Sequence, residues 1–388
     1  MKNFFDRLEK KANQYKDVYF DKPHKAALHM IMWCLKSVFK KWDVSNEIIT
    51  KENNCIKNAV LFNLQGGLGD ILIAINYLVQ LKAKFDKKII FYATLPDEVK
   101  SAVKFIDDSG CIKLADGALL NKKWALKVDL ARIPHVREVD FDNLKKISES
   151  LCEWAREIFD FNKKYSEYFK PGTVNDYLLT KFTQLDGRNR LAQADVNNFV
   201  RVKDVYKLKV SDEKAVLQDY GLNKCRYITL QCGTGVYSGE VISTREWPIE
   251  KFNGLIRLIK KNYPDIKIVQ IGSAKDLRMN ADMDLCGVTT FDEFLAILKN
   301  AVLHVGGESG CVHMRHFMCA KTSVVLFGPT NRDFYGYKEN LNISSEICPG
   351  CEWLHSGWQK FCCISGNKPE CMMKLKPEFV FKQLIGLL

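Results

Sequence analysis

The sequence predicts an α/β fold with two doubly wound, Rossmann-like parallel sheets. Short apolar runs of strand length alternate with longer helical stretches along much of the chain. Glycine-rich turns follow such runs at two distant places, residues 65–70 and residues 306–310. Repeated strand–turn–helix units of this kind build parallel sheets with helices on both faces. At 388 residues the chain is long enough for two such domains.

The composition is that of an ordinary globular protein, with 47% hydrophobic and 27% charged residues. The sequence contains no run of 18 uncharged apolar residues, so it predicts no transmembrane helix. Residues 1–11 are charged and lack the apolar centre of a signal peptide. We therefore expect a cytoplasmic protein.

The formal net charge of +12 favours acidic partners in general, among them nucleic acid, anionic lipid and phosphorylated substrates. The Lys and Arg residues are dispersed rather than gathered in a stripe, and no RNA- or DNA-binding motif is present. We therefore expect no nucleic-acid partner.

Residues 1–57 form a basic extension ahead of the first predicted strand, with 12 Lys and Arg against 7 Asp and Glu. Within residues 26–42, six apolar residues recur at helical spacing: Leu28, Ile31, Met32, Leu35, Phe39 and Trp42. Such a helix either packs on its own domain, which we favour, or lies on a membrane surface. The second interpretation would allow peripheral contact with a membrane.

The first α/β domain is predicted over residues 58–210. Its opening strand, residues 59–64, leads into the glycine turn at residues 65–70 and then into a buried helix over residues 71–85. Ligands of such sheets bind at the carboxyl ends of the strands, where this turn falls. Asp70 at the end of the turn is therefore a candidate base that faces a cleft. A helix N-cap explains an aspartate at this position equally well.

The second α/β domain is predicted over residues 211–375. It contains a strand at 226–231, a helix that starts near Pro248, and a strand at 301–305 followed by the second glycine turn. Backbone N–H groups at such a turn, together with the positive end of a helix dipole, can hold a diphosphate. From the turn alone, phosphate binding and an ordinary strand–helix connection are equally good interpretations.

A sugar nucleotide held by one domain could be attacked from the other. Such a transfer needs a base, positive groups for the leaving diphosphate and a fixed orientation of the sugar. Arg245 is the candidate diphosphate clamp, and a surface arginine is the alternative. Ser309 and Gly310 offer backbone N–H donors. His313, on the first turn of the following helix, could reach a phosphate or a ribose, with a structural helix histidine as the alternative.

Residues 226–388 resemble the heptosyltransferase family, glycosyltransferase family 9, in the order and spacing of its motifs. In the first domain the resemblance lies chiefly at Gly69-Asp70, where the family carries its proposed catalytic aspartate. Arg245 stands where the family usually has lysine, and Glu308 where it has aspartate. The matching motifs are Gln231-Cys232-Gly233-Thr234-Gly235, Thr244-Arg245-Glu246-Trp247-Pro248, Ile271-Gly272-Ser273, Glu308-Ser309-Gly310-Cys311-Val312-His313 and Phe327-Gly328-Pro329-Thr330.

The resemblance implies a GT-B fold, two Rossmann-like domains that face a cleft, and inverting transfer of heptose from ADP-heptose with Asp70 as base. It also implies that no metal assists at the diphosphate. The implied acceptor is a bacterial surface glycan, such as lipopolysaccharide or lipooligosaccharide core, or capsule. A protein acceptor of the autotransporter type and a non-catalytic sugar-nucleotide-binding protein are the alternatives. The implied donor-binding residues are Thr234, Arg245, Glu308, Ser309, Gly310 and His313.

The sugar itself stays open, because Glu308 adds a methylene beside it, so a sugar related to heptose is also allowed. Residues 94–210 are less regular and are the candidate region for acceptor recognition. Residues 376–388 are predicted to form a short amphipathic carboxyl-terminal helix.

Five of the 14 cysteines crowd into residues 348–371. Cys348, Cys351, Cys363 and Cys371 have the pattern of a four-thiolate site for zinc or iron, with reduced core thiols as the alternative. Cys363 is preferred over Cys362 because Cys-x7-Cys is a spacing that some members of the resembled family carry. Relatives of that kind glycosylate autotransporter proteins, bind iron and form large oligomers, as the resemblance implies. We expect a structural metal that clips a loop beside the donor site.

Overall fold

The computed structural model describes residues 55–120, 122–168, 176–233, 243–348, 350–355, 357–366 and 369–388. Cys55–Leu388 form one compact unit. Residues 1–54 of the predicted extension, with the helix predicted over 26–42, lie outside the described residues. Within the described ranges, no helix is long and apolar enough to cross a membrane.

The first sheet has five strands in the order β3-β2-β1-β4-β5, and only β5 runs antiparallel to its neighbour. β1 is the central strand, so the chain reverses its direction of winding between β1 and β4. Ligands of open α/β sheets bind at such a reversal, outside the carboxyl ends of the strands. The strands are β1 (Cys55–Leu64), β2 (Ile90–Thr94), β3 (Ile112–Leu114), β4 (Lys123–Leu130) and β5 (Pro134–Val139).

Helix α3 (Leu68–Lys82) follows β1 directly and is buried on most of its surface. It starts three residues earlier than predicted, because Gly67 is the N-cap and Asp70 bonds back to the Gly67 N–H. The buried Asn76 of α3 accepts hydrogen bonds from the backbone N–H groups of Val205 and Tyr206, which ties α3 to the segment between the two sheets. The other helices around this sheet are η1 (Asp97–Ala102), α4 (Val103–Ser109), α5 (Gly117–Leu120), α6 (Phe141–Ile147), α7 (Glu149–Lys164), α8 (Asp176–Leu185) and η2 (Arg190–Ala192).

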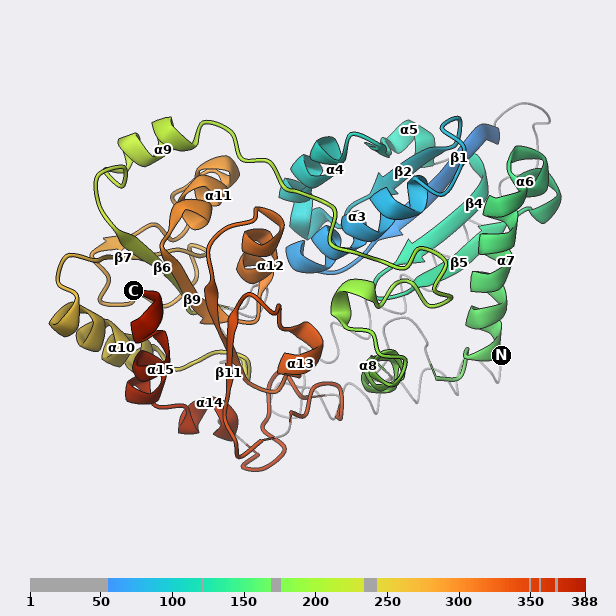
Figure 1. The fold of residues 1–388 in the computed structure, drawn as a ribbon. Coiled ribbons are helices and arrows are strands. Elements are labelled where there is room, and N and C mark those ends of the chain that lie inside the picture. The colour runs from blue at the N-terminus through green and yellow to red at the C-terminus, as the bar shows by residue number, and fades with distance from the viewer. Residues whose placement is uncertain are drawn as a thin grey trace, which may run out of the picture. The chain divides into compact units, whose positions relative to one another are not determined.

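The second sheet is parallel throughout and has the order β11-β10-β9-β6-β7-β8. Its winding reverses between β6 and β9, so the carboxyl ends of these two strands define its ligand-binding edge. The predicted fold class, two doubly wound α/β sheets, is therefore confirmed (Figure 1). The strands are β6 (Tyr227–Gln231), β7 (Lys267–Gln270), β8 (Met283–Asp284), β9 (Leu303–Gly307), β10 (Ser323–Phe327) and β11 (Leu341–Ser344).

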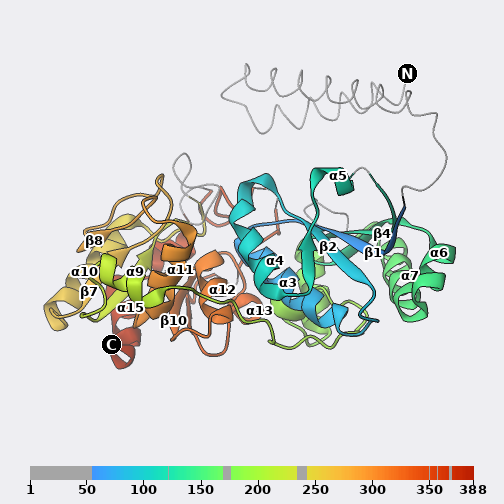
Figure 2. The ribbon, with the colours of Figure 1, turned by 90° about the horizontal axis from the view of Figure 1, so that it is seen from above.

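The helices of the second sheet include α12, which both views place beside α3 (Figures 1 and 2). The last described element of the chain, α15 followed by η3, packs against α10. The domain boundaries predicted at residues 57, 210 and 375 stay predictions. The helices are α9 (Glu213–Asp219), α10 (Ile249–Asn262), α11 (Phe291–Asn300), α12 (Gly310–Phe317), α13 (Arg332–Tyr335), α14 (Glu370–Lys374), α15 (Pro377–Leu384) and η3 (Ile385–Leu387).

A buried arginine fixes helix α12. Arg315 is 1% exposed, donates to the Ser323 hydroxyl at 3.1 Å, and donates to the backbone carbonyls of four neighbouring residues. A buried guanidinium is tolerated only when most of its donors are satisfied, as they are here. Burial lowers the pKa of Arg315 to about 10, so it keeps its proton and holds α12 against β10.

Candidate active site

The first turns of α3 and α12 lie against each other. A Cβ added to Gly69 would lie 2.3 Å from Cδ2 of His313, and one added to Gly310 would lie 3.5 Å from Cβ of Leu68. Real Cβ atoms do not approach other atoms to 2.3 Å, so only glycine at position 69 permits this contact. The two predicted glycine turns therefore meet in space and bring Asp70 next to the start of α12.

Two donors hold the Asp70 carboxylate. The Gly67 N–H donates to Oδ2 at 3.1 Å, and Nη2 of Arg190 donates to Oδ1 at 2.6 Å. Partial removal from water by itself would raise the pKa of Asp70, but Arg190 and Arg132 outweigh this effect and hold that pKa below its usual value. Asp70 is therefore ionised at neutral pH. It is not the N-cap, which is Gly67, and its side chain is 39% exposed.

Sequence reasoning missed Arg190, whose side chain is only 4% exposed. It lies on the short helix η2, 120 residues along the chain from Asp70. Its segment carries no nucleotide-type motif, and nothing in the local sequence distinguishes Arg190 from the neighbouring Arg188. The distinguishing signal is burial beside a carboxylate, because a buried arginine is stable only when paired.

Three of the predicted donor-binding residues form a second charged group. Nη2 of Arg245 lies 2.7 Å from Oε2 of Glu308 and also donates to the Glu308 backbone carbonyl. Nε2 of His313 lies 3.4 Å from the other carboxylate oxygen of Glu308. Burial would raise the pKa of Glu308, but Arg245 and His313 lower it to about 2. Nε of Arg245 is buried without a hydrogen-bond partner in the described part of the chain, so it can still bond an oxygen of a ligand.

The start of α12 presents backbone N–H donors that have no partner within the helix. Ser309 is the N-cap of this helix, but its hydroxyl donates to Oε1 of Gln231 at 2.8 Å instead of capping the helix. The first backbone N–H groups of a helix have no partner inside the helix, which applies here to Gly310 and Cys311. Gln231 ends β6, so these donors lie at the winding reversal of the second sheet. Thr234, also predicted to bind the donor, lies outside the described residues.

His313 is held by Tyr337 as well as by Glu308. Its Nδ1 lies 2.7 Å from the Tyr337 hydroxyl, and the direction of that hydrogen bond depends on the tautomer of the imidazole. Burial raises the pKa of Tyr337 well above its usual value, so the phenol stays neutral. The structural alternative for His313, a hydrogen-bonded helix histidine, and the ligand-binding interpretation are both compatible with this arrangement.

A third group joins the first sheet to the loop of residues 348–371, the cysteine loop. Arg132, which follows β4, donates to the Tyr335 hydroxyl at 2.7 Å and lies 3.6 Å from Oε1 of Glu352. Glu352 also accepts from the Tyr335 hydroxyl at 2.6 Å and from the indole N–H of Trp353 at 2.9 Å. Arg132, which lowers the pKa of Asp70 together with the stronger Arg190, is thus held in part by Glu352 of the cysteine loop. Sequence analysis identified neither Arg132 nor Glu352.

The thiols of the cysteine loop are neighbours. Burial and the nearby Cys363 raise the pKa of Cys351 to about 12, and burial and Cys348 raise the pKa of Cys371 to about 12. Cys351 and Cys371 are buried, Cys348 is half-buried and Cys363 is exposed. In the ranges that the structure describes, no three His, Cys, Asp or Glu side chains converge as a metal-binding set. The metal site at these four cysteines therefore stays a prediction.

Comparison with known proteins extends these findings. The family model described as glycosyltransferase family 9 (heptosyltransferase) matches residues 188–352. No curated protein matches the chain. The ADP-heptose lipopolysaccharide heptosyltransferase II of E. coli is structurally similar, with a TM-score of 0.53 and 15% identity over 86% of this chain and 98% of that chain.

Two further solved structures are similar. A family 9 glycosyl transferase from Veillonella parvula has a TM-score of 0.51 and 14% identity over 88% of this chain and 99% of that chain. The iron-containing dodecameric glycosyltransferase TibC of enterotoxigenic E. coli has a TM-score of 0.55 and 13% identity over 87% of this chain and 78% of that chain. At such identities the likeness is one of fold, and the predicted GT-B fold with two Rossmann-like domains is confirmed.

Proposed function

We propose that this chain, whose residues 188–352 match the model of glycosyltransferase family 9 (heptosyltransferase), is a glycosyltransferase that transfers a heptose from an ADP-heptose donor with inversion. The observation that carries the proposal is the ionised Asp70 carboxylate, set against the amino terminus of α12 and beside Arg245, Glu308 and His313. A base and an anion-binding helix end are thus side by side, as transfer from a diphospho-sugar requires.

In this mechanism the acceptor hydroxyl attacks the anomeric carbon of the heptose. The bond between that carbon and the oxygen of the β-phosphate breaks, ADP leaves, and Asp70 takes the hydroxyl proton. The pKa of Asp70 lies below its usual value, so the carboxylate is a weak base for an unreacted hydroxyl. Proton transfer therefore comes late, when bond formation has made the attacking oxygen acidic.

The leaving ADP needs donors at its β-phosphate. Nε of Arg245, which has no partner among the described residues, and the backbone N–H groups of Gly310 and Cys311 are suited to that task. Ser309 belongs to the proposed phosphate site, Thr234 outside the described residues stays a predicted member of it, and Glu308 and His313 bind hydroxyl groups of the donor. Arg245 is engaged by Glu308 in the described structure, so donor binding would compete for that pair. Arginine in place of lysine allows two parallel bonds to phosphate oxygens.

We further propose a bacterial surface glycan as acceptor, at a cytoplasmic location with peripheral contact to the inner membrane. A protein acceptor is the second candidate, favoured by the cysteine loop. TibC, one of the similar structures, is iron-containing and has been solved with ADP-D-β-D-heptose. A non-catalytic sugar-nucleotide-binding protein would need the second-domain site but not Asp70, so transfer by the purified chain separates it from an enzyme.

The proposed metal, zinc or iron, would be held by Cys348, Cys351, Cys363 and Cys371 and would have a structural role. The support is the proximity of these thiols, which come from three separate stretches of the loop. Elemental analysis of the purified protein tests it: Cys363→Ser should lose the metal and lower the melting temperature, whereas Cys362→Ser should keep both. Metal-free protein of unchanged stability would favour reduced core thiols instead.

Donor choice is tested by thermal shift with a panel of ADP- and GDP-linked sugars, because a ligand of the folded state raises its apparent stability. We expect ADP-heptose to give the largest shift. Asp70→Asn should abolish transfer and leave ADP binding intact. Asp97→Asn, at an aspartate whose side chain is 91% exposed, is the matched control. Turnover that survives in Asp70→Asn would refute the base, and stabilisation by a GDP-sugar alone would refute the donor.

A further inference from the structure

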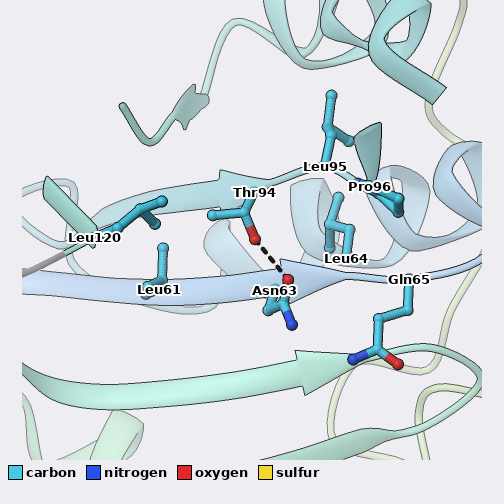
Figure 3. A pocket seen from close by; sticks show the side chains of 8 residues that line it. All are labelled: Leu61, Asn63, Leu64, Gln65, Thr94, Leu95, Pro96 and Leu120. Atoms are coloured by element: carbon cyan, nitrogen blue, oxygen red, sulfur yellow. Dashed lines mark hydrogen bonds between the residues drawn. The ribbon is translucent and has the colours of Figure 1, made fainter. Parts of the chain in front are cut away.

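A cavity of about 410 Å³ opens at the carboxyl edge of the first sheet (Figure 3). Its size falls in the range of small-molecule sites, which are mostly apolar and carry a few oriented polar groups. Uncharged polar side chains stand on one part of its wall and apolar side chains on the rest. The lining residues are Leu61, Asn63, Leu64, Gln65, Thr94, Leu95, Pro96 and Leu120.

The polar wall is an ordered row across three neighbouring strands. The Thr94 hydroxyl on β2 donates to Oδ1 of Asn63 on β1 at 2.7 Å, as Figure 3 shows. Nδ2 of Asn63 donates to Asp129 on β4 at 3.2 Å, and Nε2 of Gln65 donates to the other oxygen of Asp129 at 3.2 Å. An amide has two hydrogens and two lone pairs. These bonds therefore orient both amides and leave each with capacity to bond a hydroxyl group.

The charge beside this row is neutralised. Asp129 is paired with Arg137, whose Nε lies 2.6 Å from Oδ2. His135 faces Asp129 from β5, and burial together with Arg137 lowers the pKa of His135 to about 4, so this imidazole is neutral at physiological pH. None of the eight lining side chains is charged. An anionic ligand would find no unpaired cation on the wall of this cavity.

The wall of the cavity is linked to the proposed base through the turn of residues 65–70. Gln65, in its wall, is followed directly by Gly66, where an added Cβ would lie 2.6 Å from Oδ2 of Asp70. Gly66 has φ of +108°, a backbone conformation that favours glycine, and the missing side chain lets the Asp70 carboxylate lie against the backbone of the turn. A sugar in the cavity would therefore lie beside the turn that carries Asp70.

On these grounds we propose that the cavity binds the acceptor, and that the acceptor residue bound there is an uncharged sugar. The amides of Asn63 and Gln65 bond its hydroxyl groups, and the leucine and proline side chains contact its C–H surface. This inference rests on the proposed glycosyl transfer, and it narrows the acceptor class. A carboxylated or phosphorylated sugar in this position is disfavoured, because its charge would lose water without gaining a cation.

The decisive variant is Leu120→Trp. Leu120 is 43% exposed, so a larger side chain there fills the cavity without disturbing the core. Leu114→Trp is the matched control, since Leu114 is 42% exposed. It pairs with Ala93 on β2, whereas the neighbouring Thr94 lines the cavity, so Leu114 belongs to the opposite face of the sheet.

Binding is measured by saturation-transfer-difference NMR with two probes that differ only at C6. These are methyl α-D-glucopyranoside, which is neutral, and methyl α-D-glucopyranosiduronic acid, which is ionised at pH 7. We expect the neutral glycoside to give signals with the wild type and with Leu114→Trp and to lose them with Leu120→Trp. The uronate should give much weaker signals throughout.

Signals that persist in Leu120→Trp, or an absence of signals in the wild type, would overturn the site. Equal or stronger signals from the uronate would overturn the neutral-sugar assignment. Thermal shift with ADP-heptose on the same samples keeps the two proposals apart. If ADP-heptose stabilises the wild type but the glycoside does not bind, only the acceptor cavity is refuted. If ADP-heptose does not raise the melting temperature of the wild type, the proposed function is refuted.

Discussion

Gly69→Ala tests the meeting of the two glycine turns most directly. The added Cβ would lie 2.3 Å from Cδ2 of His313, and ordinary contact begins at 3.4 Å, so the ring must move by about 1.1 Å. His313 is 2.7 Å from the Tyr337 hydroxyl. A shift of that size along this bond breaks it, which costs roughly 0.5–1.5 kcal/mol. Overpacking adds roughly 1–3 kcal/mol.

The catalytic effect should exceed the effect on stability. Displacement of a positioning group by about 1 Å can cost roughly a hundredfold in rate, so we expect a drop in kcat/KM of about that size with a melting temperature only a few degrees lower. The assay is transfer from ADP-heptose, with heat denaturation alongside. Gly67→Ala is the matched control in the same turn, because a Cβ at Gly67 meets nothing within 4 Å. If Gly69→Ala behaves like Gly67→Ala, the contact between Gly69 and His313 has no functional role.

Three further changes test other parts of the site. Arg190→Met removes the main cation beside Asp70, so the pKa of Asp70 should rise. The acid limb of the pH–rate profile should then move to higher pH. An acid limb at the wild-type position would exclude Asp70 as the titrating base. The ionised Asp70 stabilises the folded state at pH values above the pKa that it has in the unfolded chain, and this stabilisation is lost as the pH falls through its lower pKa in the folded protein. Arg190→Met should therefore reduce the decrease in the free energy of unfolding that denaturation curves show at acid pH. Arg315→Met leaves four carbonyls and a hydroxyl without their donor, and should lower the free energy of unfolding by roughly 3 kcal/mol or more; a loss below about 1 kcal/mol in chemical denaturation would contradict the packing described. Thr244→Val removes the 2.6 Å bond from the Thr244 hydroxyl to the Trp358 carbonyl and should raise the KM for donor through the adjacent Arg245, whereas Thr244→Ser should not; equal KM values would show that the cysteine loop does not position the donor site.

Local patterns in the sequence predicted the scaffold of this protein. The alternation of apolar runs and helical stretches predicted two doubly wound sheets, and the turns at residues 65–70 and 306–310 predicted strand–helix junctions that the structure contains. Such features depend on side chains a few positions apart, so a single sequence reveals them. The position of Asp70 in its turn and the start of α12 were accessible for the same reason, whereas α3 starts three residues earlier than its pattern predicted.

The partners of these residues were decided only by tertiary packing. Arg190 meets Asp70 across 120 positions, and Tyr337 meets His313 across 24 positions. The guanidinium of Arg245 is engaged by Glu308. The thiols predicted to hold a metal are neighbours, but they do not converge as a ligand set in the part of the chain that the structure describes, and the metal stays a prediction. Ion pairs and shared cavities form between segments that loops bring together, and no local periodicity encodes which segments meet. The chain's own sequence therefore determined where the candidate groups lie along each strand and helix, and the packing of the two sheets decided which of them act together.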